Sequence, residues 1–164
     1  KSDLIFNEVE SSMVLDKVKE ICSKHKKEAY KDFQVLVPMY KTLNGIDNLN
    51  KELQSIFNPA SKDKKEVKYG DVIYREGDKV LQLVNDPDNN VFNGDIGIIY
   101  SIKSNNQSKS GKVEVYIDFD GNMVIYQVKD LANIKHGFII SIHKAQGSEF
   151  DFVDLRYGLK SHMS

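Results

Sequence analysis

Residues 138–155, which read FIISIHKAQGSEFDFVDL, decide the fold of this chain. An apolar run leads directly into a histidine, a lysine, a glutamine, a glycine and a glutamate, and apolar residues resume at Phe150. Buried strands of α/β proteins are near-continuous apolar runs, and ligands bind in the crevice outside the carboxyl ends of such strands. The stretch therefore predicts a buried parallel strand that is followed at once by a segment suited to a functional site.

The sequence before this stretch predicts strands that alternate with helices. A short strand is expected at residues 3–6, followed by a helix whose N-cap is Ser11 or Ser12. A second apolar strand, residues 33–39, is ended by Pro38. The helix after it has an apolar face made of Ile46, Leu49, Leu53, Ile56 and Phe57. Strands and helices that alternate at this spacing predict a parallel sheet covered by helices.

From Val67 the apolar pattern changes from a helical period to the alternation that is typical of short strands. The alternating runs are residues 78–84, 95–102, 112–119 and 123–128. Between the last two runs, the sequence Asp120-Gly121-Asn122 is a strong signal for a tight hairpin. Four or five short strands in about seventy residues predict a small closed barrel. We therefore expect a barrel at residues 67–131, inserted into an α/β domain that consists of residues 1–66 and 132–164.

The composition is that of a globular protein with nearly balanced charge. The chain has 164 residues, 40% of them hydrophobic, with 23 basic and 24 acidic side chains. This balance creates no overall field that would attract nucleic acid, so any contact with DNA or RNA must be local. Cys22 is the only cysteine, which excludes an internal disulfide and favours a reducing, cytoplasmic location. No apolar stretch approaches the roughly twenty residues of a membrane helix, so no membrane partner is expected.

The two ends predict that the chain is a piece of a longer protein. The first expected strand, at residues 3–6, has no preceding cap or turn. The last residues, 155–164, stop without the end of a helix or strand.

Residues 106–113 come closest to a phosphate-binding loop. Such a loop needs a glycine, four residues and then Gly-Lys-Ser/Thr, because backbone N–H groups wrap the phosphates and the hydroxyl reaches magnesium. Asn106 stands in place of the first glycine, and Val113 follows Lys112 in place of serine or threonine. The chain is therefore not expected to build the phosphate site of ATP by itself.

Two acidic stretches are weak candidates for a metal site. Residues 113–120 resemble a strand that ends in a magnesium-binding aspartate, but their strict alternation is typical of a half-exposed barrel strand. Residues 86–97 resemble a calcium loop, but Val91 occupies the position that needs glycine and Gly97 that of the bidentate glutamate. No metal site is predicted.

Three segments, taken in order, resemble the second motor domain of RecD-like superfamily 1 DNA helicases, the group that includes the alpha subunit of exodeoxyribonuclease V. Residues 141–150, SIHKAQGSEF, match the helicase motif V pattern Thr/Ser-x-His-Lys-Ser/Ala-Gln-Gly-Ser-Glu-Phe at every position. Residues 35–59 resemble the motif IV region, with a helix that carries Leu49 and Asn50. Residues 77–97 resemble the start of the Src-homology-3-like barrel that these helicases insert into this domain.

The resemblance implies a fold of the α/β plus β class, in which a small Src-homology-3-like β-barrel interrupts a partial RecA-like parallel sheet with helices. The full-length protein is then an ATP-dependent DNA helicase of repair and recombination, with ATP and Mg²⁺ as cofactors. Its phosphate-binding loop, magnesium-binding Asp-Glu motif and coupling motif belong to a first motor domain that is absent from this chain, and the arginine-bearing motif VI is missing as well. We therefore expect this chain alone to be inactive and to bind no cofactor tightly.

The resemblance also implies partners and the residues that contact them. The partners are single-stranded DNA, the missing N-terminal motor domain of the same protein and, where such a complex exists, nuclease subunits. The residues implied to contact DNA are Ser141, His143, Lys144, Pro38, Met39 and Tyr40. The first two would hydrogen-bond the DNA backbone and Lys144 would add charge, since phosphate contacts position a strand without reading its sequence. The turn at residues 38–40 either lines the DNA path or only ends its strand. Exposed barrel residues such as Tyr100 or Lys103 would guide the DNA.

Three residues of the same stretch are implied to serve the ATP side. Gly147 permits a sharp turn, and Glu149 would accept a hydrogen bond from the ribose hydroxyl of ATP, as acidic residues do in dinucleotide sites. Gln146 would link the DNA side to the nucleotide side. The chain would thus supply one grip on DNA and one wall of the ATP cleft.

A second hypothesis, from another functional class, stays open on the sequence. Small barrels also bind oligonucleotides, so the chain could be a non-catalytic module that holds single-stranded nucleic acid or a protein partner. The polar residues of 141–150 would then be only the solvated end of a strand and a loop. The predicted strands lack a dense stripe of aromatic and basic residues, which favours the helicase. An upstream reading frame without a phosphate-binding loop would exclude the helicase.

Overall fold

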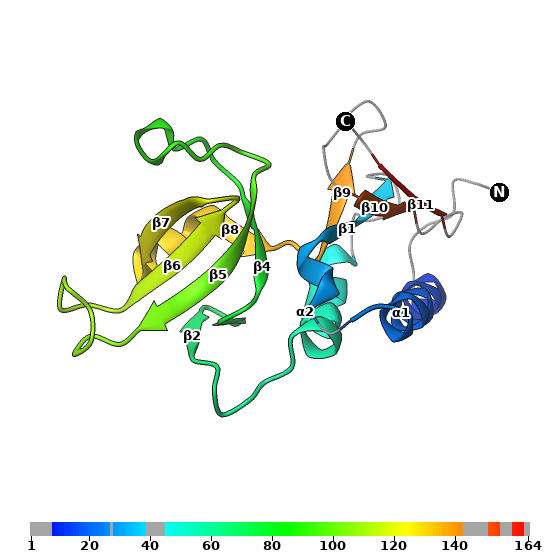
Figure 1. The fold of residues 1–164 in the computed structure, drawn as a ribbon, viewed down its shortest axis with the longest axis horizontal. Helices are drawn as coiled ribbons and strands as arrows, with labels where there is room; N and C mark the ends of the chain where they lie inside the picture. Colours follow the sequence, from blue (N-terminus) through cyan, green and yellow to red (C-terminus); the bar gives the residue numbers. More distant parts are fainter. Residues whose placement is uncertain (1–7, 27, 39–44, 143–150, 155–158, 163–164) are drawn as a thin grey trace. The chain divides into compact units, whose positions relative to one another are not determined.

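The structure is a computed structural model that describes residues 8–26, 28–38, 45–142, 151–154 and 159–162 (Figure 1). The chain divides into two compact units, which are described here separately. The α/β unit consists of residues 1–59 and 138–164, and the β unit consists of residues 60–137. No helix in the described part of the chain is long and apolar enough to cross a membrane.

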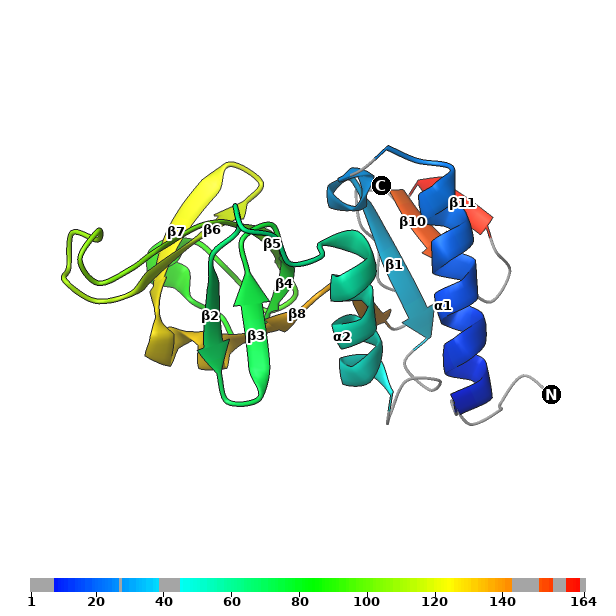
Figure 2. The ribbon, with the colours of Figure 1, turned by 90° about the horizontal axis from the view of Figure 1, so that it is seen from below.

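Strands from distant parts of the chain form the sheet of the α/β unit (Figure 2). Its four strands lie in the order β11 (Leu159–His162), β10 (Asp151–Asp154), β1 (Phe33–Pro38) and β9 (Ile139–Ile142). β9 and β10 both pair with β1 in parallel, while β11 pairs with β10 in antiparallel. The expectation that residues 155–164 end without a strand is wrong, because pairing with β10 orders β11.

The first helix of this unit starts earlier than its sequence suggests. The helix α1 is Glu8–Ser23, so Ser11 and Ser12 both lie inside it. The prediction that one of them is the N-cap is therefore wrong. Glutamates precede both serines; glutamate is a better helix former than serine, and the helix dipole favours acidic side chains near the N-terminus.

The second helix, α2 (Ile46–Phe57), has the apolar face that the sequence predicts. Leu49, Leu53 and Phe57 are buried, and the acidic Asp47 lies in the first turn, where the helix dipole favours it. The short 3-10 helix η1 (Ala29–Lys31) comes just before β1 in the chain. The buried face of α2 thus contributes to the core of the α/β unit.

Aromatic rings fill much of the core of the α/β unit. The ring of Tyr30 lies 5.4 Å from that of Phe57 and 5.8 Å from that of Phe138, measured between centroids. Phe57 and Phe138 are 5.9 Å apart. Phe138, the first residue of the unit after the β unit, is 2% exposed, so the apolar run that opens residues 138–155 is anchored in this core.

The β unit is made of antiparallel strands. Its five-stranded sheet has the order β7 (Asn122–Gln127), β6 (Glu114–Phe119), β5 (Ile96–Lys103), β4 (Lys79–Gln82) and β8 (Ile134–His136). A separate hairpin consists of β2 (Glu66–Tyr69) and β3 (Val72–Arg75). Two 3-10 helices, η3 (Pro87–Asn89) and η4 (Val128–Asn133), lie in the connections. The four alternating runs of the sequence correspond to β4, β5, β6 and β7.

The hairpin between β6 and β7 has the predicted tight turn. Phe119 faces Asn122 across the two strands, and Asp120 and Gly121 between them have φ angles of 53° and 94°. A two-residue hairpin turn of type I′ requires a positive φ at both central residues. In β6 the alternating apolar residues Val115, Ile117 and Phe119 are buried, and Glu114 on the other face of the strand is also only 5% exposed.

Candidate nucleic-acid interface

The carboxyl ends of β1 and β9 lie next to each other in the sheet. The parallel register pairs Val37 with Ser141 and Pro38 with Ile142. Ser141 is half-buried, whereas Ile139 earlier in the same strand is fully buried. The structure thus brings Pro38 and Ser141, two of the residues implied to contact DNA, to the same edge of one sheet. Ligands of α/β proteins bind in the crevice outside the carboxyl ends of such parallel strands.

The other predicted site residues lie outside the described part of the chain. They are Met39, Tyr40, His143, Lys144, Gln146, Gly147 and Glu149. In sequence, Met39 follows Pro38 and His143 follows Ile142, which are the last residues of the two paired strands. Their contacts with DNA and ATP stay predictions.

Two buried amide side chains hold the first residues of the segment that contains β9. Asn50 of α2 uses both ends of its amide on Ile139: Nδ2 donates to the carbonyl oxygen and Oδ1 accepts from the backbone N–H, each at 2.9 Å. Gln34 of β1 donates from Nε2 to the carbonyl oxygen of Phe138 at 3.3 Å. The position of Ser141 therefore depends on side chains from two other elements. The sequence does not predict these roles, and its one signal for them is a polar residue on an otherwise apolar strand or helix face.

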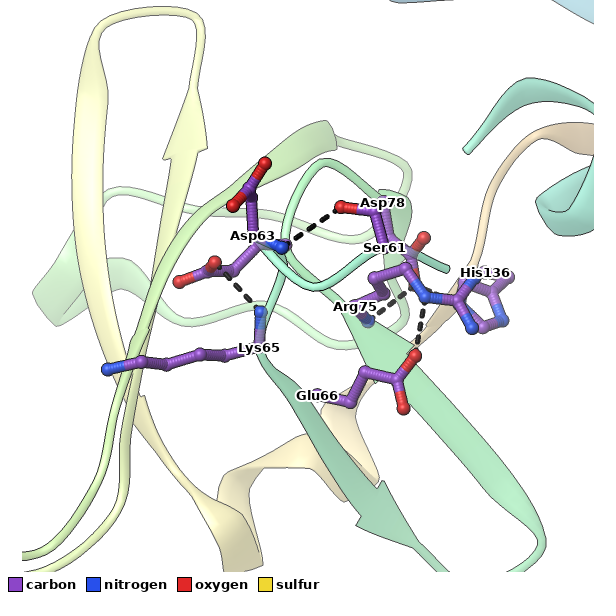
Figure 3. A network of polar contacts seen from close by, with 8 residues as sticks. Ser61, Asp63, Lys65, Glu66, Arg75, Asp78 and His136 are labelled. Carbon is purple, nitrogen blue, oxygen red and sulfur yellow. Dashed lines mark hydrogen bonds and ion pairs between the residues drawn. The ribbon is translucent and has the colours of Figure 1, made fainter. Parts of the chain in front are cut away.

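The β unit contains a buried polar network (Figure 3). The side chain of Asp78 is fully buried, and its Oδ2 accepts a hydrogen bond from the backbone N–H of Arg75 at 2.8 Å. The same oxygen lies 2.7 Å from Nε2 of His136. Nε of Arg75 in turn pairs with Oε2 of Glu66 at 2.6 Å. These contacts join β2, β3 and β8. Loss of one partner would leave the buried Asp78 carboxylate without compensation, which is costly.

A β-bulge places Tyr100 on the surface of the β unit. Ile99 pairs with Ile117 and Ser101 pairs with Tyr116, so Tyr100 is the extra residue of β5 between them. Its side chain is 69% exposed. Bulges bend a strand and re-aim one side chain, and they occur preferentially beside functional sites. Of the two barrel residues named from the sequence, Tyr100 is therefore the one that is presented to solvent.

Lys103 is less available to a partner than Tyr100. Its Nζ lies 5.5 Å from the ring centroid of Tyr116, and its strand register places it opposite Glu114. Hydrogen bonds from Ser110, and then from the hydroxyl of Tyr116, hold the pKa of Glu114 below its usual range. The carboxylate therefore stays charged beside Lys103, and it offsets the attraction of this lysine for a phosphate.

No group of three or more His, Cys, Asp or Glu side chains in the described ranges is arranged to hold a metal ion. The α/β unit has one candidate contact surface, where β1 and β9 end. The β unit has a separate candidate, the exposed side chain of Tyr100.

Sequence comparisons identify relatives of the chain. Residues 49–119 match the family described as the ATP-dependent RecD-like DNA helicase SH3 domain. Over 120 residues the chain is 38% identical to the ATP-dependent RecD2 DNA helicase of Deinococcus radiodurans, a match that covers 73% of this chain and 15% of that protein. It is 32% identical over 127 residues to the RecBCD enzyme subunit RecD of Buchnera aphidicola subsp. Acyrthosiphon pisum, covering 75% of this chain and 19% of that one.

Among solved structures, Bacteroides Pif1 bound to ssDNA is similar with a TM-score of 0.46 and 14% identity, over 92% of this chain and 41% of that one. The chain spans less than one fifth of the length of the two curated relatives. It belongs to the RecD-like DNA helicase family, and residues 49–119 carry the SH3 domain of that family.

Proposed function

We propose that this chain is part of an ATP-dependent DNA helicase, in which the α/β unit supplies one grip on single-stranded DNA and one wall of the ATP cleft. The observation that supports this most is the 38% identity over 120 residues to the RecD2 helicase of Deinococcus radiodurans. The α/β unit is then part of a second RecA-like motor domain. ATP and Mg²⁺ bind between it and a first motor domain, and closing and opening of the two domains moves the DNA.

The DNA grip is proposed for the edge where β1 and β9 end. Ser141 at the end of β9 carries a hydroxyl that can donate a hydrogen bond to a phosphate oxygen. His143 and Lys144 follow after Ile142 in the sequence and add a second donor and a positive charge. Such contacts hold any DNA sequence equally well, as translocation requires. The identity of a relative as a RecBCD enzyme subunit supports further protein partners for the full-length protein.

The role of Glu149 tests this proposal in the full-length protein. If its carboxylate accepts a hydrogen bond from the ribose, the wild type should prefer ATP over 3′-deoxy-ATP by about ten-fold or more, because a charge-assisted bond contributes about 1.5–3 kcal/mol. Glu149→Ala should weaken this preference, mainly by slowing the reaction of ATP. Steady-state hydrolysis of both nucleotides by both proteins forms a double-mutant cycle that isolates the one contact.

His143→Ala is the matched control for Glu149→Ala, since the two residues lie in the same segment of sequence. It should leave the preference for ATP unchanged while weakening DNA binding and DNA-stimulated hydrolysis, because its proposed partner is a phosphate of DNA. Equal slowing of both nucleotides by Glu149→Ala would show that the ribose contact does not exist.

The exposed Tyr100 should contribute to DNA binding by stacking on a base. Tyr100→Ala in the full-length protein should weaken binding of single-stranded DNA about five-fold or more, because stacking of a base on an aromatic ring contributes about 1–3 kcal/mol. Tyr100→Phe should retain the affinity. Fluorescence anisotropy with a labelled oligonucleotide measures this. Ile125→Ala, at a side chain that is 50% exposed on β7, is the control. If both alanine variants bind as the wild type does, Tyr100 does not contact DNA.

A further inference from the structure

Asn50 is a buried polar residue, and both the nitrogen and the oxygen of its side-chain amide form hydrogen bonds with the strand β9. The residue is 2% exposed, and its amide makes a donor and an acceptor contact with the backbone of Ile139. Nδ2 also donates to the carbonyl oxygen of Ile46, one turn earlier in α2, at 3.2 Å. This third contact holds the side chain against its own helix, so the position of Ile139 is tied to that of α2.

The amide of Asn50 takes the place of a neighbouring strand. Among the described strands of this sheet, β9 lies at one edge, with β1 on its other side. A side-chain amide carries the same donor and acceptor as a peptide group, so Asn50 pairs with Ile139 as the backbone of another strand would. Strand pairing sets register, and a slip by one residue would turn each side chain of β9 to the opposite face.

The contact lies close to the edge that is proposed to hold DNA. Ser141 is two residues beyond Ile139, which corresponds to about 7 Å along a strand. α2, which carries Asn50, is the helix that follows the segment after Pro38, and Pro38 lies beside the end of β9. Asn50 therefore connects α2 with β9, the strand that ends beside Pro38.

We propose that Asn50 is a positioning residue for single-stranded DNA binding: by pairing with Ile139 it sets the place and register of Ser141 at the carboxyl edge of the sheet. This role rests on the proposed function, since it presumes that Ser141 contacts DNA. Asn50 itself touches no substrate. It acts through β9, so its loss affects the affinity for DNA more than the chemical step.

The test uses DNA-stimulated ATP hydrolysis by the full-length protein. Asn50→Leu has a similar size but cannot pair with Ile139. It should raise the half-saturating concentration of single-stranded DNA by about ten-fold and change the maximal rate by less than about two-fold. The reason is that the variant loses ground-state binding of DNA, whereas the chemical step of ATP hydrolysis is unaffected. Asn50→Gln keeps both polar groups but displaces them by about one bond length, ~1.5 Å, and should weaken DNA binding while it preserves most of the stability.

Leu53→Ala is the control for a general loss of stability. Leu53 is fully buried on the same helix and is apolar, so its truncation lowers the stability of the α/β unit without removing a hydrogen bond to β9. At a temperature where all variants are folded, its half-saturating DNA concentration should match that of the wild type. Hydrogen exchange at the amide of Ile139 should become faster in Asn50→Leu than in Leu53→Ala, which checks the contact itself without DNA.

The outcomes separate the positioning role from the proposed DNA grip. If Asn50→Leu and Leu53→Ala weaken DNA binding equally, or if Asn50→Gln binds DNA as the wild type does, Asn50 only stabilises the fold and the positioning role is wrong. If Ser141→Ala also leaves the DNA affinity unchanged, the grip at this edge is wrong as well. Weaker binding by Ser141→Ala together with normal binding by both Asn50 variants would overturn the positioning role alone.

Discussion

Phe138→Ala should lower the free energy of unfolding of the α/β unit by about 3–5 kcal/mol, because it removes a buried ring and leaves a cavity. Phe138 is 2% exposed and packs against the rings of Tyr30 and Phe57. Among the described residues, its core cluster and the core cluster of the β unit have no member in common. Native-state hydrogen exchange reports the opening of each unit separately, and protection should fall in the α/β unit and stay unchanged in the β unit.

Leu131→Ala is the reciprocal control, since Leu131 is fully buried in the core of the β unit. It should lower protection in the β unit by about 2–5 kcal/mol and leave the α/β unit unchanged. An equal loss of protection in both units for each variant would mean that they unfold as one cooperative body, which would contradict the prediction.

The chain alone should hydrolyse no ATP above background, with or without DNA, at least about 10³-fold below the full-length protein. Catalysis of phosphoryl transfer consists almost entirely of positioning and charge stabilisation, and a single arginine finger already contributes about 10³–10⁵-fold. The 164 residues contain no Gly-x-x-x-x-Gly-Lys-Ser/Thr sequence to wrap the phosphates. Phosphate release with and without single-stranded DNA, with the full-length protein assayed alongside, measures the difference.

Measurements of DNA and ATP binding by the same chain test the same prediction without hydrolysis. DNA binding should be weak and should fall steeply with salt, because few phosphates are neutralised by the edge of β1 and β9. Calorimetry should detect no stoichiometric, tight binding of ATP. A tight complex would show that the chain carries a complete nucleotide site and would refute the proposal of a cleft shared with a first motor domain.

Features that depend only on neighbouring residues can be predicted from the sequence. The apolar positions of α2 repeat at helical spacing, so its buried face follows from geometry alone. Asp120 and Gly121 tolerate the positive φ angles of the β6–β7 turn, so this hairpin is also a local property. The resemblance to the helicase family is also carried by the sequence, through three segments in order: residues 35–59, 77–97 and 141–150. The start of α1 does not follow from Ser11 or Ser12, because serine is a common cap but does not by itself start a helix.

Only the tertiary structure decided which buried polar groups act together. Asn50 and Ile139 are 89 residues apart in the chain, and Asp78 and His136 are 58 apart. Periodicity shows that a face is buried but not which segment covers it, so neither pair could be found from the sequence. Buried polar groups nearly always find a hydrogen-bond partner, and here that partner comes from a distant element that packing brings within reach. The register that sets Ser141 beside Val37 is decided in the same way, because it depends on pairing between strands more than one hundred residues apart.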